Sequence, residues 1–416
     1  MSALTLIGAH RAVSSLLENR PASWDVVRFK GLFDRLDQRN TDLSYEMLSL
    51  RSTGEVVVRA ELGGRQEPDE TSLPKYLVAK VDDLVVNPMW LIGGGIGVSG
   101  RAGAVSPDYR VFRSRGPLLP RFIHYLLRSQ PYLDQYLLYT RAQTTFDRRV
   151  QQPDLDNLPI PVPPLDEQRV IADYLDRETA RIDTLIEEQQ RLIEMLRERR
   201  QGVLSLASDG DWPTASLGLL LEGIKDGTHG SFERTAPGEG MPLLGARNVM
   251  GSRIVLDGAE SFISEEDYQS IVANGFPAKS DVLLVIVGAT IGKTAVYDLD
   301  TRHAFQRSVA FLRPTGRFEP KFLWYQIQAS RFHDELTLRA KTSAQPGIYM
   351  GDVTAIPVVV PSLEEQRQIV AYLDEQTAKI DTLIAETDRF IELARERRAA
   401  LITAAVTGQI DVREMV

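Results

Sequence analysis

The chain has 416 residues, of which 43% are hydrophobic and 25% charged, so it is long enough to form more than one domain. It contains no cysteine, which excludes disulfides, thiolate nucleophiles and cysteine-ligated metals, and it has five histidines, which leave little for a histidine cluster. The formal net charge is −9, and no stretch reaches the roughly 18 uncharged apolar residues that a membrane span needs.

The negative charge is segregated along the chain. Residues 1–150 carry a net charge of +4, residues 151–207 carry −5, and residues 208–352 and 353–416 carry −4 each. The overall charge therefore does not exclude an acidic partner such as DNA, and charge alone does not indicate one. Residues 1–20 lack the basic start of a secretory signal, and the missing cysteine fits the reducing cytoplasm, where we expect the protein.

Two motif-like strings follow the strand-like segment Asp83–Val86. Gly95–Gly100 satisfies the pattern GxGxxG, but a dinucleotide fold needs a helix directly afterwards, and residues 101–107 are typical of a turn and a strand. We therefore predict a glycine-rich loop that binds no cofactor. Asn87-Pro88-Met89-Trp90 resembles the Asn-Pro-Pro-aromatic motif of adenine methyltransferases, but its third residue differs, and we see no cofactor-binding strand and helix upstream.

A long helix is predicted after a proline-rich segment. Pro159, Pro161, Pro163 and Pro164 keep the chain extended, and acidic residues near Leu165 suit the first turn of a helix. About 40 residues at 1.5 Å each give a rod roughly 60 Å long. Apolar residues follow in steps of three, four and seven, which predicts a coiled-coil seam. Its members in this first helix are Ile171, Leu175, Ile182, Leu185 and Leu192.

The segment after this helix contains a string similar to a phosphate-binding loop. Gly288–Thr294 ends in Gly-Lys-Thr, but it has three residues between its glycines where the motif has four. One missing residue changes which backbone N–H groups can cradle a phosphate. We therefore predict that the segment does not hydrolyse nucleotides.

The proline-rich segment and the helix are then repeated. A shift of 198 residues aligns residues 159–205 with residues 357–403 without a gap, and 26 of the 47 positions are identical. The preceding segments match only faintly, as between Asp83–Val86 and Asp281–Leu284. The chain is thus a duplicated pair of a divergent domain and a nearly invariant helix. The second seam comprises Ile369, Leu373, Ile380, Leu383 and Phe390.

One such helix cannot bury its own apolar stripe, but two copies can bury theirs against each other. A pure spacer would need only the apolar seam, yet polar positions are also identical between the copies. We infer that they form a face for two identical partners; the alternatives are that some only bridge the two helices, or that the coiled coil is only a spacer. These positions are Asp183, Thr184, Arg191 and Glu194, with the copies Asp381, Thr382, Arg389 and Glu392.

We predict a mixed α/β (α+β) fold in which two recognition domains are each followed by a long helix. The two helices are expected to pair as an antiparallel coiled coil with pseudo-twofold symmetry. The predicted boundaries are residues 1–154 for the first domain, 155–207 for the central helical region, 208–352 for the second domain and 353–416 for the C-terminal helical region.

With the repeat laid out, the chain resembles the specificity subunits of type I restriction–modification systems. Leu158–Gln168, followed by Ile171 and Leu175, resembles the start of their central helix, and its copy from Ile356 to Gln366 resembles the start of their C-terminal helix. Val85–Trp90 and Ser106–Tyr109 are similar to the first target recognition domain. Val287–Lys293 and Gln306–Ala310 recur in many second domains. The resemblance spans essentially the whole chain and is most specific in the helices.

The resemblance implies a non-catalytic DNA reader without a cofactor or metal. Two recognition domains would each read one half of a bipartite, asymmetric site in double-stranded DNA. The paired helices would fix the gap between the half-sites and dock two methyltransferase (modification) subunits. Methyl transfer would belong to those subunits, and translocation and cleavage to separate motor–nuclease (restriction) subunits; no membrane is involved.

Candidate DNA-contacting residues follow from side-chain chemistry, because Arg, Lys, Asn and Gln read base edges and the cations also neutralise phosphates. In the first domain they are Arg101, Arg141, Arg148 and Arg149, and in the second Arg247, Asn248, Lys293, Arg307, Lys341 and Gln345. The alternative for each is solvated surface charge. Two other functions stay open at this point: a coiled-coil adaptor with two protein-binding heads, and a protein related to DNA adenine methyltransferases, as the Asn87–Trp90 string suggests.

Overall fold

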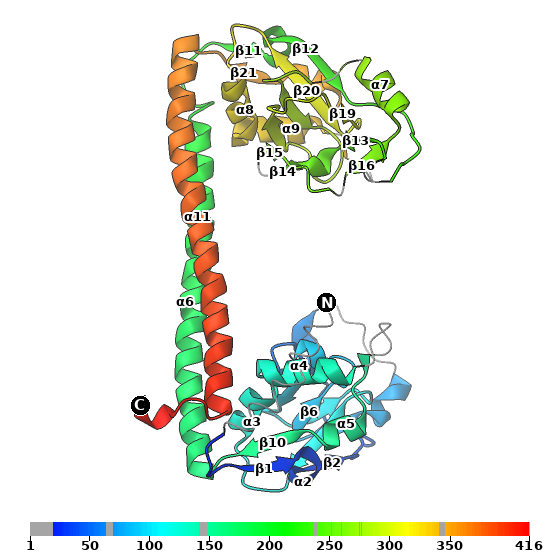
Figure 1. Ribbon diagram of the computed structural model, residues 1–416, viewed down its shortest axis with the longest axis vertical. Helices are drawn as coiled ribbons and strands as arrows, with labels where there is room; N and C mark the ends of the chain where they lie inside the picture. The colour runs from blue at the N-terminus through cyan, green and yellow to red at the C-terminus, as the bar shows by residue number, and fades with distance from the viewer. Residues whose placement is uncertain are drawn as a thin grey trace. The chain divides into compact units, whose positions relative to one another are not determined.

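The computed structural model describes residues 20–63, 70–140, 148–236, 239–250, 252–258, 260–273, 275, 277–340 and 346–415. The chain divides into two compact units (Figure 1). Unit 1 comprises Met1–Gln189 and Arg389–Val416, and unit 2 comprises Gln190–Asp388. Each unit therefore contains a globular part together with a section of both long helices.

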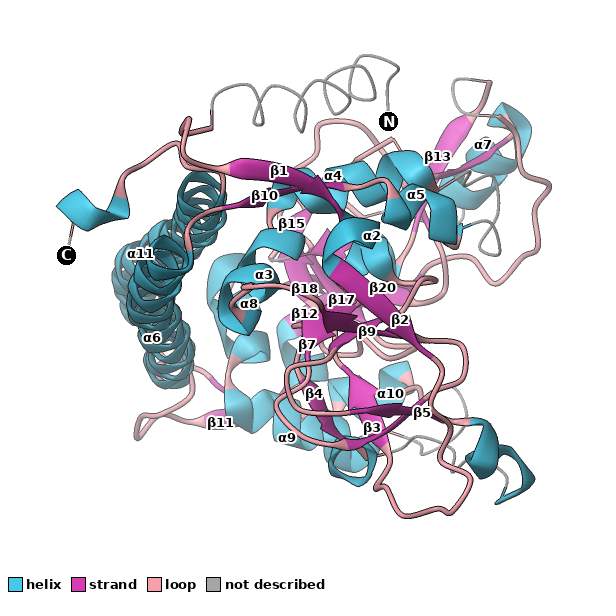
Figure 2. Cartoon of the chain, turned by 90° about the horizontal axis from the view of Figure 1, so that it is seen from below, coloured by secondary structure: helices cyan, strands magenta, loops and turns pink. Residues whose placement is uncertain are grey.

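The globular part of unit 1 is built from short strands and three-turn or shorter helices (Figure 2). Its elements are β1 (Asp25–Arg28), α2 (Phe29–Leu32), β2 (Phe33–Leu36), β3 (Leu48–Leu50), β4 (Val56–Val58), η1 (Arg59–Leu62), η2 (Glu70–Lys75), β5 (Leu77–Ala79), β6 (Leu84–Val86), η3 (Leu91–Gly93), β7 (Ile96–Val98), β8 (Gly103–Val105), β9 (Arg110–Ser114), α3 (Pro120–Leu127), α4 (Gln130–Tyr139), α5 (Gln152–Asp156) and β10 (Pro159–Val162).

A four-stranded antiparallel sheet with the order β2-β9-β6-β7 is the centre of this part. Its middle strands are rich in Val, Leu and Phe, which favour a pleated, buried surface. The pairs β1–β10, β3–β4 and β5–β8 are also antiparallel. Helix α3 starts with Pro120 in its first turn and buries Phe122, Ile123, Leu126 and Leu127, which follow the helical period.

Unit 2 repeats this plan with different sequence (Figure 1). Its globular elements are β11 (Thr214–Ser216), η5 (Leu217–Leu220), β12 (Leu221–Asp226), β13 (Met241–Leu244), η6 (Ala246–Asn248), β14 (Val249–Met250), β15 (Arg253–Ile254), β16 (Ser261–Ile263), α7 (Glu265–Ala273), β17 (Val282–Val285), β18 (Thr294–Val296), β19 (Ala304–Phe305), β20 (Val309–Pro314), α8 (Pro320–Gln328), α9 (Ser330–Arg339), α10 (Met350–Thr354) and β21 (Pro357–Val359).

The sheet β12-β20-β17-β18 of unit 2 matches the central sheet of unit 1, and the pair β11–β21 matches β1–β10. A separate sheet with the order β16-β13-β19 contains the parallel pair β13–β19. The predicted mixed α/β class with two copies is therefore confirmed. Within the described residues its sheets are mainly antiparallel.

The two predicted long helices are present. Helix α6 spans Leu165–Ser205, starting where the acidic first turn predicts, and α11 spans Leu363–Val406; the short turn η7 (Val412–Glu414) follows. No helix in the described part of the chain is long and apolar enough to cross a membrane.

The ends of the long helices belong to the cores of the globular parts. In unit 1, Ile171 and Leu175 of α6 lie in one apolar cluster with Ala405 and Val406 of α11 and with α3. In unit 2, Leu204 and Leu373 lie in one cluster with α8. Burial of these apolar faces fixes where the globular part meets the helices.

The predicted domain boundaries fall inside short helices. The boundary after residue 154 cuts α5, and the boundary after residue 352 cuts α10. The following strands β10 and β21 pair with β1 and β11, so they continue the globular parts. The proline-rich segments read from the sequence as extended are thus sheet strands that lead into the helices.

The buried seam of the helices differs in register from the predicted one. Ile171, Leu175, Ile182, Leu373 and Ile380 are buried, whereas Leu185, Leu192 and Ile369 are half-buried. Leu383 and Phe390 are 48% and 43% exposed, so the prediction that they lie in the seam is wrong. The buried positions after Ile182 lie at Ile186 and Ile193 in α6 and at Thr387 and Ile391 in α11. After Ile182 the next buried position is four residues on, at Ile186, whereas the predicted seam took the residue three positions on, Leu185.

Candidate nucleic-acid interface and its supporting framework

The same ion pair, between a buried aspartate and a half-exposed arginine, supports the central sheet of both globular parts. Asp83, 1% exposed, accepts two hydrogen bonds of 2.8 Å from Arg113. Asp281, 2% exposed, accepts bonds of 2.9 and 2.8 Å from Arg313. Each aspartate also accepts a backbone N–H bond, from Lys80 in unit 1 and from Ala278 in unit 2. The hydrogen bond with Asp83 raises the pKa of Arg113, so the arginine stays charged.

The glycine-rich strings lie in hairpins of these sheets. Gly95–Gly100 runs into β7, which pairs with β6, and Gly288–Lys293 joins β17 to β18. Gly97 has to be glycine because a Cβ there would lie 1.8 Å from the Gly54 carbonyl oxygen, and Gly292 has a φ of +90°. Neither string is followed by a helix, as a dinucleotide fold or a phosphate loop requires. In the first string the prediction of a loop is only partly correct, because Ile96–Val98 form strand β7.

The Asn87–Trp90 string forms the loop between β6 and η3. The Asn87 side chain accepts a hydrogen bond of 3.1 Å from the Met89 N–H, and the Asn87 N–H donates to Gly95. Trp90 is 46% exposed at this loop. Exposed aromatic and backbone groups on a hairpin can contact a nucleic acid. The sequence analysis names Trp90 within the Asn87–Trp90 string but does not select it as a DNA contact.

Three of the four candidates of the first domain lie in described residues. Arg101 follows β7, is exposed and lies 3.9 Å from Glu61. Arg149 is exposed, donates toward Met89 at 3.3 Å and lies 3.8 Å from Asp108, next to the Asn87–Trp90 loop. Arg148 beside it is half-buried, and Arg141 lies outside the described residues. Arg149 is thus the candidate that contacts the Asn87–Trp90 loop directly.

In the second domain, the candidates differ in exposure. Lys293 and Arg307 are exposed, and Arg247 is exposed opposite Asp257 at 3.3 Å. Asn248 is 2% exposed, its side chain accepts from Gly245 and donates to Val255, and it is therefore committed to holding this turn. The expectation that Asn248 reads bases is thus wrong in this structure, because its polar atoms are already paired. Lys341 and Gln345 lie outside the described residues.

Arg128, which directly follows α3, was missed by sequence reasoning. Its guanidinium donates to the carbonyls of Gly94, Ile96 (3.1 Å) and Ser52 (2.9 Å), so it ties the first hairpin to the β3–β4 region. Burial lowers the pKa of Arg128, with Arg398 as a further cause. No motif marks such an anchor, because its partners are backbone carbonyls distant in sequence.

The retained polar residues of the long helices dock the globular parts. Gln168 is buried, accepts from the Leu119 N–H at 2.8 Å and donates to the carbonyls of Pro117 and Pro163. Its copy Gln366 makes the same three contacts with Glu319, Arg317 and Pro361. A buried amide with all these partners fixes the loop before α3 or α8 on the helix.

A tyrosine adds a second docking contact in each unit. Tyr125 of α3 donates to Asp176 at 2.8 Å and lies 3.2 Å from Thr179, and Tyr325 of α8 contacts Asp374 and Thr377 in the same way. Burial raises the pKa of Tyr125 to about 12. These contacts give a physical reason why Asp176 and Thr179 recur in the second copy without any external partner.

Replacement of Gln168 by leucine is expected to destabilise unit 1 by about 2–4 kcal/mol, because it leaves buried backbone groups without partners. Gln366→Leu should have the same effect on unit 2. Urea unfolding followed by tryptophan fluorescence would measure both changes. Gln130→Leu serves as the control, since Gln130 is exposed and contacts only Asp134. Equal small effects of all three substitutions would contradict the docking role.

The predicted partner-face residues divide into two groups. Asp183 pairs with Arg398 at 2.8 Å, and Asp381 pairs with Arg200 at 2.8 Å, so these aspartates bridge α6 and α11. Thr382 and Arg389 bond within α11, to Ala378 and Glu392. Thr184, Arg191 and Glu194 are exposed on α6. The alternative that some retained polar residues bridge the helices is thus correct for Asp183 and Asp381.

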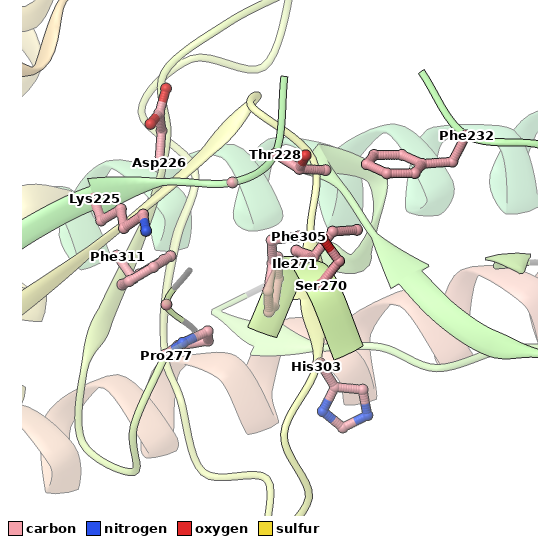
Figure 3. Close-up of a pocket in the computed structure, with 12 residues that line it drawn as sticks. Lys225, Asp226, Thr228, Phe232, Ser270, Ile271, Pro277, His303, Phe305 and Phe311 are labelled. Atoms are coloured by element: carbon pink, nitrogen blue, oxygen red, sulfur yellow. The ribbon is translucent and has the colours of Figure 1, made fainter. Parts of the chain in front are cut away.

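A small cavity of about 120 Å³ lies in the globular part of unit 2 (Figure 3). Phe305, Phe311 and Ile271 line it, with His303, Lys225 and Asp226 among its polar groups. His303 bonds to the Tyr297 hydroxyl at 2.9 Å, and burial lowers its pKa. The volume is below the roughly 300–1,000 Å³ of typical ligand pockets. Among the described residues, no group of three or more His, Asp or Glu side chains could hold a metal ion.

Comparison with known proteins shows to which protein family a chain with this duplicated architecture belongs. The model of the type I restriction modification DNA specificity domain matches residues 105–195 and 225–392, which together are more than half of the chain. The chain belongs to this family.

Curated relatives agree with the family. The chain is 23% identical over 281 residues to the EcoBI specificity subunit from Escherichia coli, covering 60% of this chain and 58% of that protein. It is 24% identical over 306 residues to the MjaVIII specificity subunit from Methanocaldococcus jannaschii, covering 68% and 69%. The matched part is thus 58% of the length of the first relative.

Solved structures share the fold. A chain from a study of complex assembly and conformational transition of the type I R-M system aligns with a TM-score of 0.74 and 20% identity, covering 94% of this chain and all of the other. The HsdS subunit from Thermoanaerobacter tengcongensis aligns with a TM-score of 0.56 and 20% identity, covering 94% and 98%.

Proposed function

We propose that the protein is the DNA sequence-specificity subunit of a type I restriction–modification enzyme. The observation that carries this proposal is the repetition, within one chain, of a globular part built on the same Asp–Arg pair and docked on a long helix by the same glutamine. Two copies of a DNA-recognising part would fit a DNA site with two halves. The surface residues differ between the copies while the framework is shared, which would allow the two halves to have different sequences. The family match and the relatives' names support the same function.

Each globular part is proposed to act as one target recognition domain. Residues 1–154 would form the first and residues 208–352 the second, each completed by the adjoining strand, β10 or β21. The exposed cations Arg101, Arg149, Arg247, Lys293 and Arg307 are the proposed DNA contacts, some to phosphates and some to base edges. Each domain would read one half of an asymmetric, bipartite site in double-stranded DNA.

Residues 155–207 and 353–416 are proposed to form the spacer as an antiparallel coiled coil with pseudo-twofold symmetry. Two ion pairs support this: Asp183 with Arg398 in unit 1, and Arg200 with Asp381 in unit 2. A shift of 198 residues converts one pair into the other, as a twofold relation between antiparallel helices requires. The spacer would fix the gap between the half-sites.

A charge exchange tests this pairing. Asp381→Arg should destabilise unit 2 by about 0.5–1 kcal/mol, because it places two cations side by side on a partly exposed surface. The double variant Asp381→Arg/Arg200→Asp should recover at least half of that loss. A double-mutant cycle by urea unfolding measures the coupling. A double variant whose loss equals the sum of the single losses would speak against the pairing.

The proposed partners supply the chemistry. Two methyltransferase subunits would bind the spacer and transfer the methyl group, and motor–nuclease subunits would translocate and cleave DNA in the cytoplasm. The chain itself would need no cofactor, because its glycine-rich strings are hairpin loops. Thr184, Arg191 and Glu194 are exposed and remain the proposed partner face on α6.

Co-expression with the methyltransferase encoded beside it tests the proposal. The expected result is a complex of two methyltransferases with one copy of this chain, measured by native mass spectrometry, that binds DNA more tightly than the chain alone. If the chain forms no complex with the methyltransferase, this result would favour the adaptor function. Binding of S-adenosylmethionine by the isolated chain in calorimetry would favour a methyltransferase-related function instead.

A further inference from the structure

A large cavity in unit 1 is not accounted for by the recognition function. It has a volume of about 530 Å³ and lies between α3 and the sections of α6 and α11 that belong to this unit. Its lining includes the cations Arg128, Arg395 and Arg398, together with His124, Tyr125 and Asp183. The volume is within the range of pockets that hold small molecules.

The residues that line the cavity carry more positive than negative charge. Asp183 is the carboxylate of the lining, and it is bound to Arg398 at 2.8 Å. The two acids whose charges act on His124 are also paired, Glu55 with Arg51 at 3.4 Å and Asp176 with Arg121. Among the described residues, Arg128 and Arg395 have no carboxylate within ion-pair distance. Two cations thus line the cavity without an acidic counterpart.

The cationic groups face one another closely enough to interact. Burial lowers the pKa of Arg128, and the charge of Arg398 lowers it further. Burial, and then the charges of Arg128 and Arg398, lower the pKa of His124 to about 4, so this imidazole is neutral at pH 7. A dianion in the cavity would reduce the repulsion between the arginines, and the neutral imidazole of His124 offers an additional N–H donor.

The second copy shows that the fold does not require Arg128 or His124. The equivalents of Arg395, Arg398 and Asp183 are retained in unit 2 as Arg197, Arg200 and Asp381. On α8, however, His124 is replaced by Trp324 and Arg128 by Gln328. Trp324 is buried, and Gln328 bonds to Trp324 and Ser252. The smaller imidazole and the additional arginine are therefore particular to unit 1.

We propose that this cavity is a binding site for a phosphate group, held by Arg128, Arg395 and Arg398. The phosphate comes either from a small free molecule or from the DNA backbone, and both present the same dianionic or anionic oxygens to the arginines. The site is independent of the proposed function, because the chain alone carries every residue that forms it.

Calorimetric titration of the full chain with inorganic pyrophosphate tests the proposal. We expect one saturable site, and we expect Arg395→Gln to weaken it about tenfold, since one charge-assisted contact is lost. Arg197→Gln removes the same charge at the equivalent position of unit 2 and should leave the affinity within about twofold. His124→Trp copies the residue of unit 2, keeps the net charge and should abolish binding by filling the cavity.

Each outcome decides the proposal. No saturable binding, or equal weakening by Arg395→Gln and Arg197→Gln, would overturn it in favour of nonspecific charge attraction. Unchanged pyrophosphate affinity in Arg395→Gln with lost methyltransferase binding would overturn it in favour of a protein contact. Thermal unfolding of each variant shows whether the fold is kept.

Two further experiments with duplex DNA identify the source of the phosphate. If DNA displaces pyrophosphate, and Arg395→Gln reduces the salt dependence of DNA binding by about one ion, the phosphate belongs to DNA. If pyrophosphate binds equally well with DNA present, the site takes a free phosphate compound. Both results support the phosphate site.

Discussion

Arg113→Met is expected to lower the free energy of unfolding of unit 1 by about 3–5 kcal/mol, since it leaves a buried carboxylate without its cation. Asp83 is 1% exposed, and Arg113 supplies both side-chain hydrogen bonds to it. Within the described part of the chain, removal of the arginine leaves the Lys80 N–H as the one hydrogen-bond donor to the Asp83 carboxylate. The expected loss is a large share of the stability of a typical domain.

The duplicated chain provides its own controls for this substitution. Arg313→Met should destabilise unit 2 by a similar amount, because Asp281 is buried to the same degree. Arg115→Met removes an ion pair with Asp34 in which both side chains are about half exposed, and it should cost clearly less stability than Arg113→Met. Urea unfolding of the three variants gives the comparison. A loss in Arg113→Met no larger than in Arg115→Met would contradict the framework role.

Exchange of the second globular part is expected to change one half of the methylated DNA motif and leave the other half unchanged. The exchange should cover residues 208–362, because β21 pairs with β11 and both precede α11. The donor should be a family member that keeps the glutamine equivalent to Gln366, since this residue docks the domain on its helix. The length of the gap should persist, because the spacer helices are not changed.

Modified-base sequencing of host DNA reads the outcome of the exchange. The original two-part motif should lose its methylation entirely, and a hybrid motif should gain it. Exchange of the first globular part up to residue 164 is the matched control and should change the opposite half. A change in both halves from one exchange would contradict independent reading by the two domains.

The duplicated architecture could be predicted from the sequence, because it rests on signals that are local or repeated. The start of α6 at Leu165 followed from the prolines and the acidic first turn, and the start of α11 followed from the repeat. The departure of Gly288–Thr294 from the phosphate-loop motif followed from its spacing, and the structure has a strand after it where that motif requires a helix. These features depend on neighbouring residues, which a sequence displays directly.

The internal order of the globular parts could not be predicted, because it depends on contacts between distant segments. Asp83 meets Arg113 and Gln168 meets the loop before α3 only after the sheet has formed. Asn248 was selected for its chemistry but is committed to a turn. The seam register shifted by one residue at Leu383 and Phe390, since the sequence offers apolar residues at both positions and only packing decides between them.

If this chain directs methylation to a bipartite DNA site, modified-base sequencing of host DNA from strains with and without the gene will show it. The expected result is adenine methylation at one asymmetric two-part motif that disappears when the gene is deleted and returns when it is restored. A methylation pattern that is identical in both strains would contradict the account and leave the duplicated helical architecture without a role in DNA recognition.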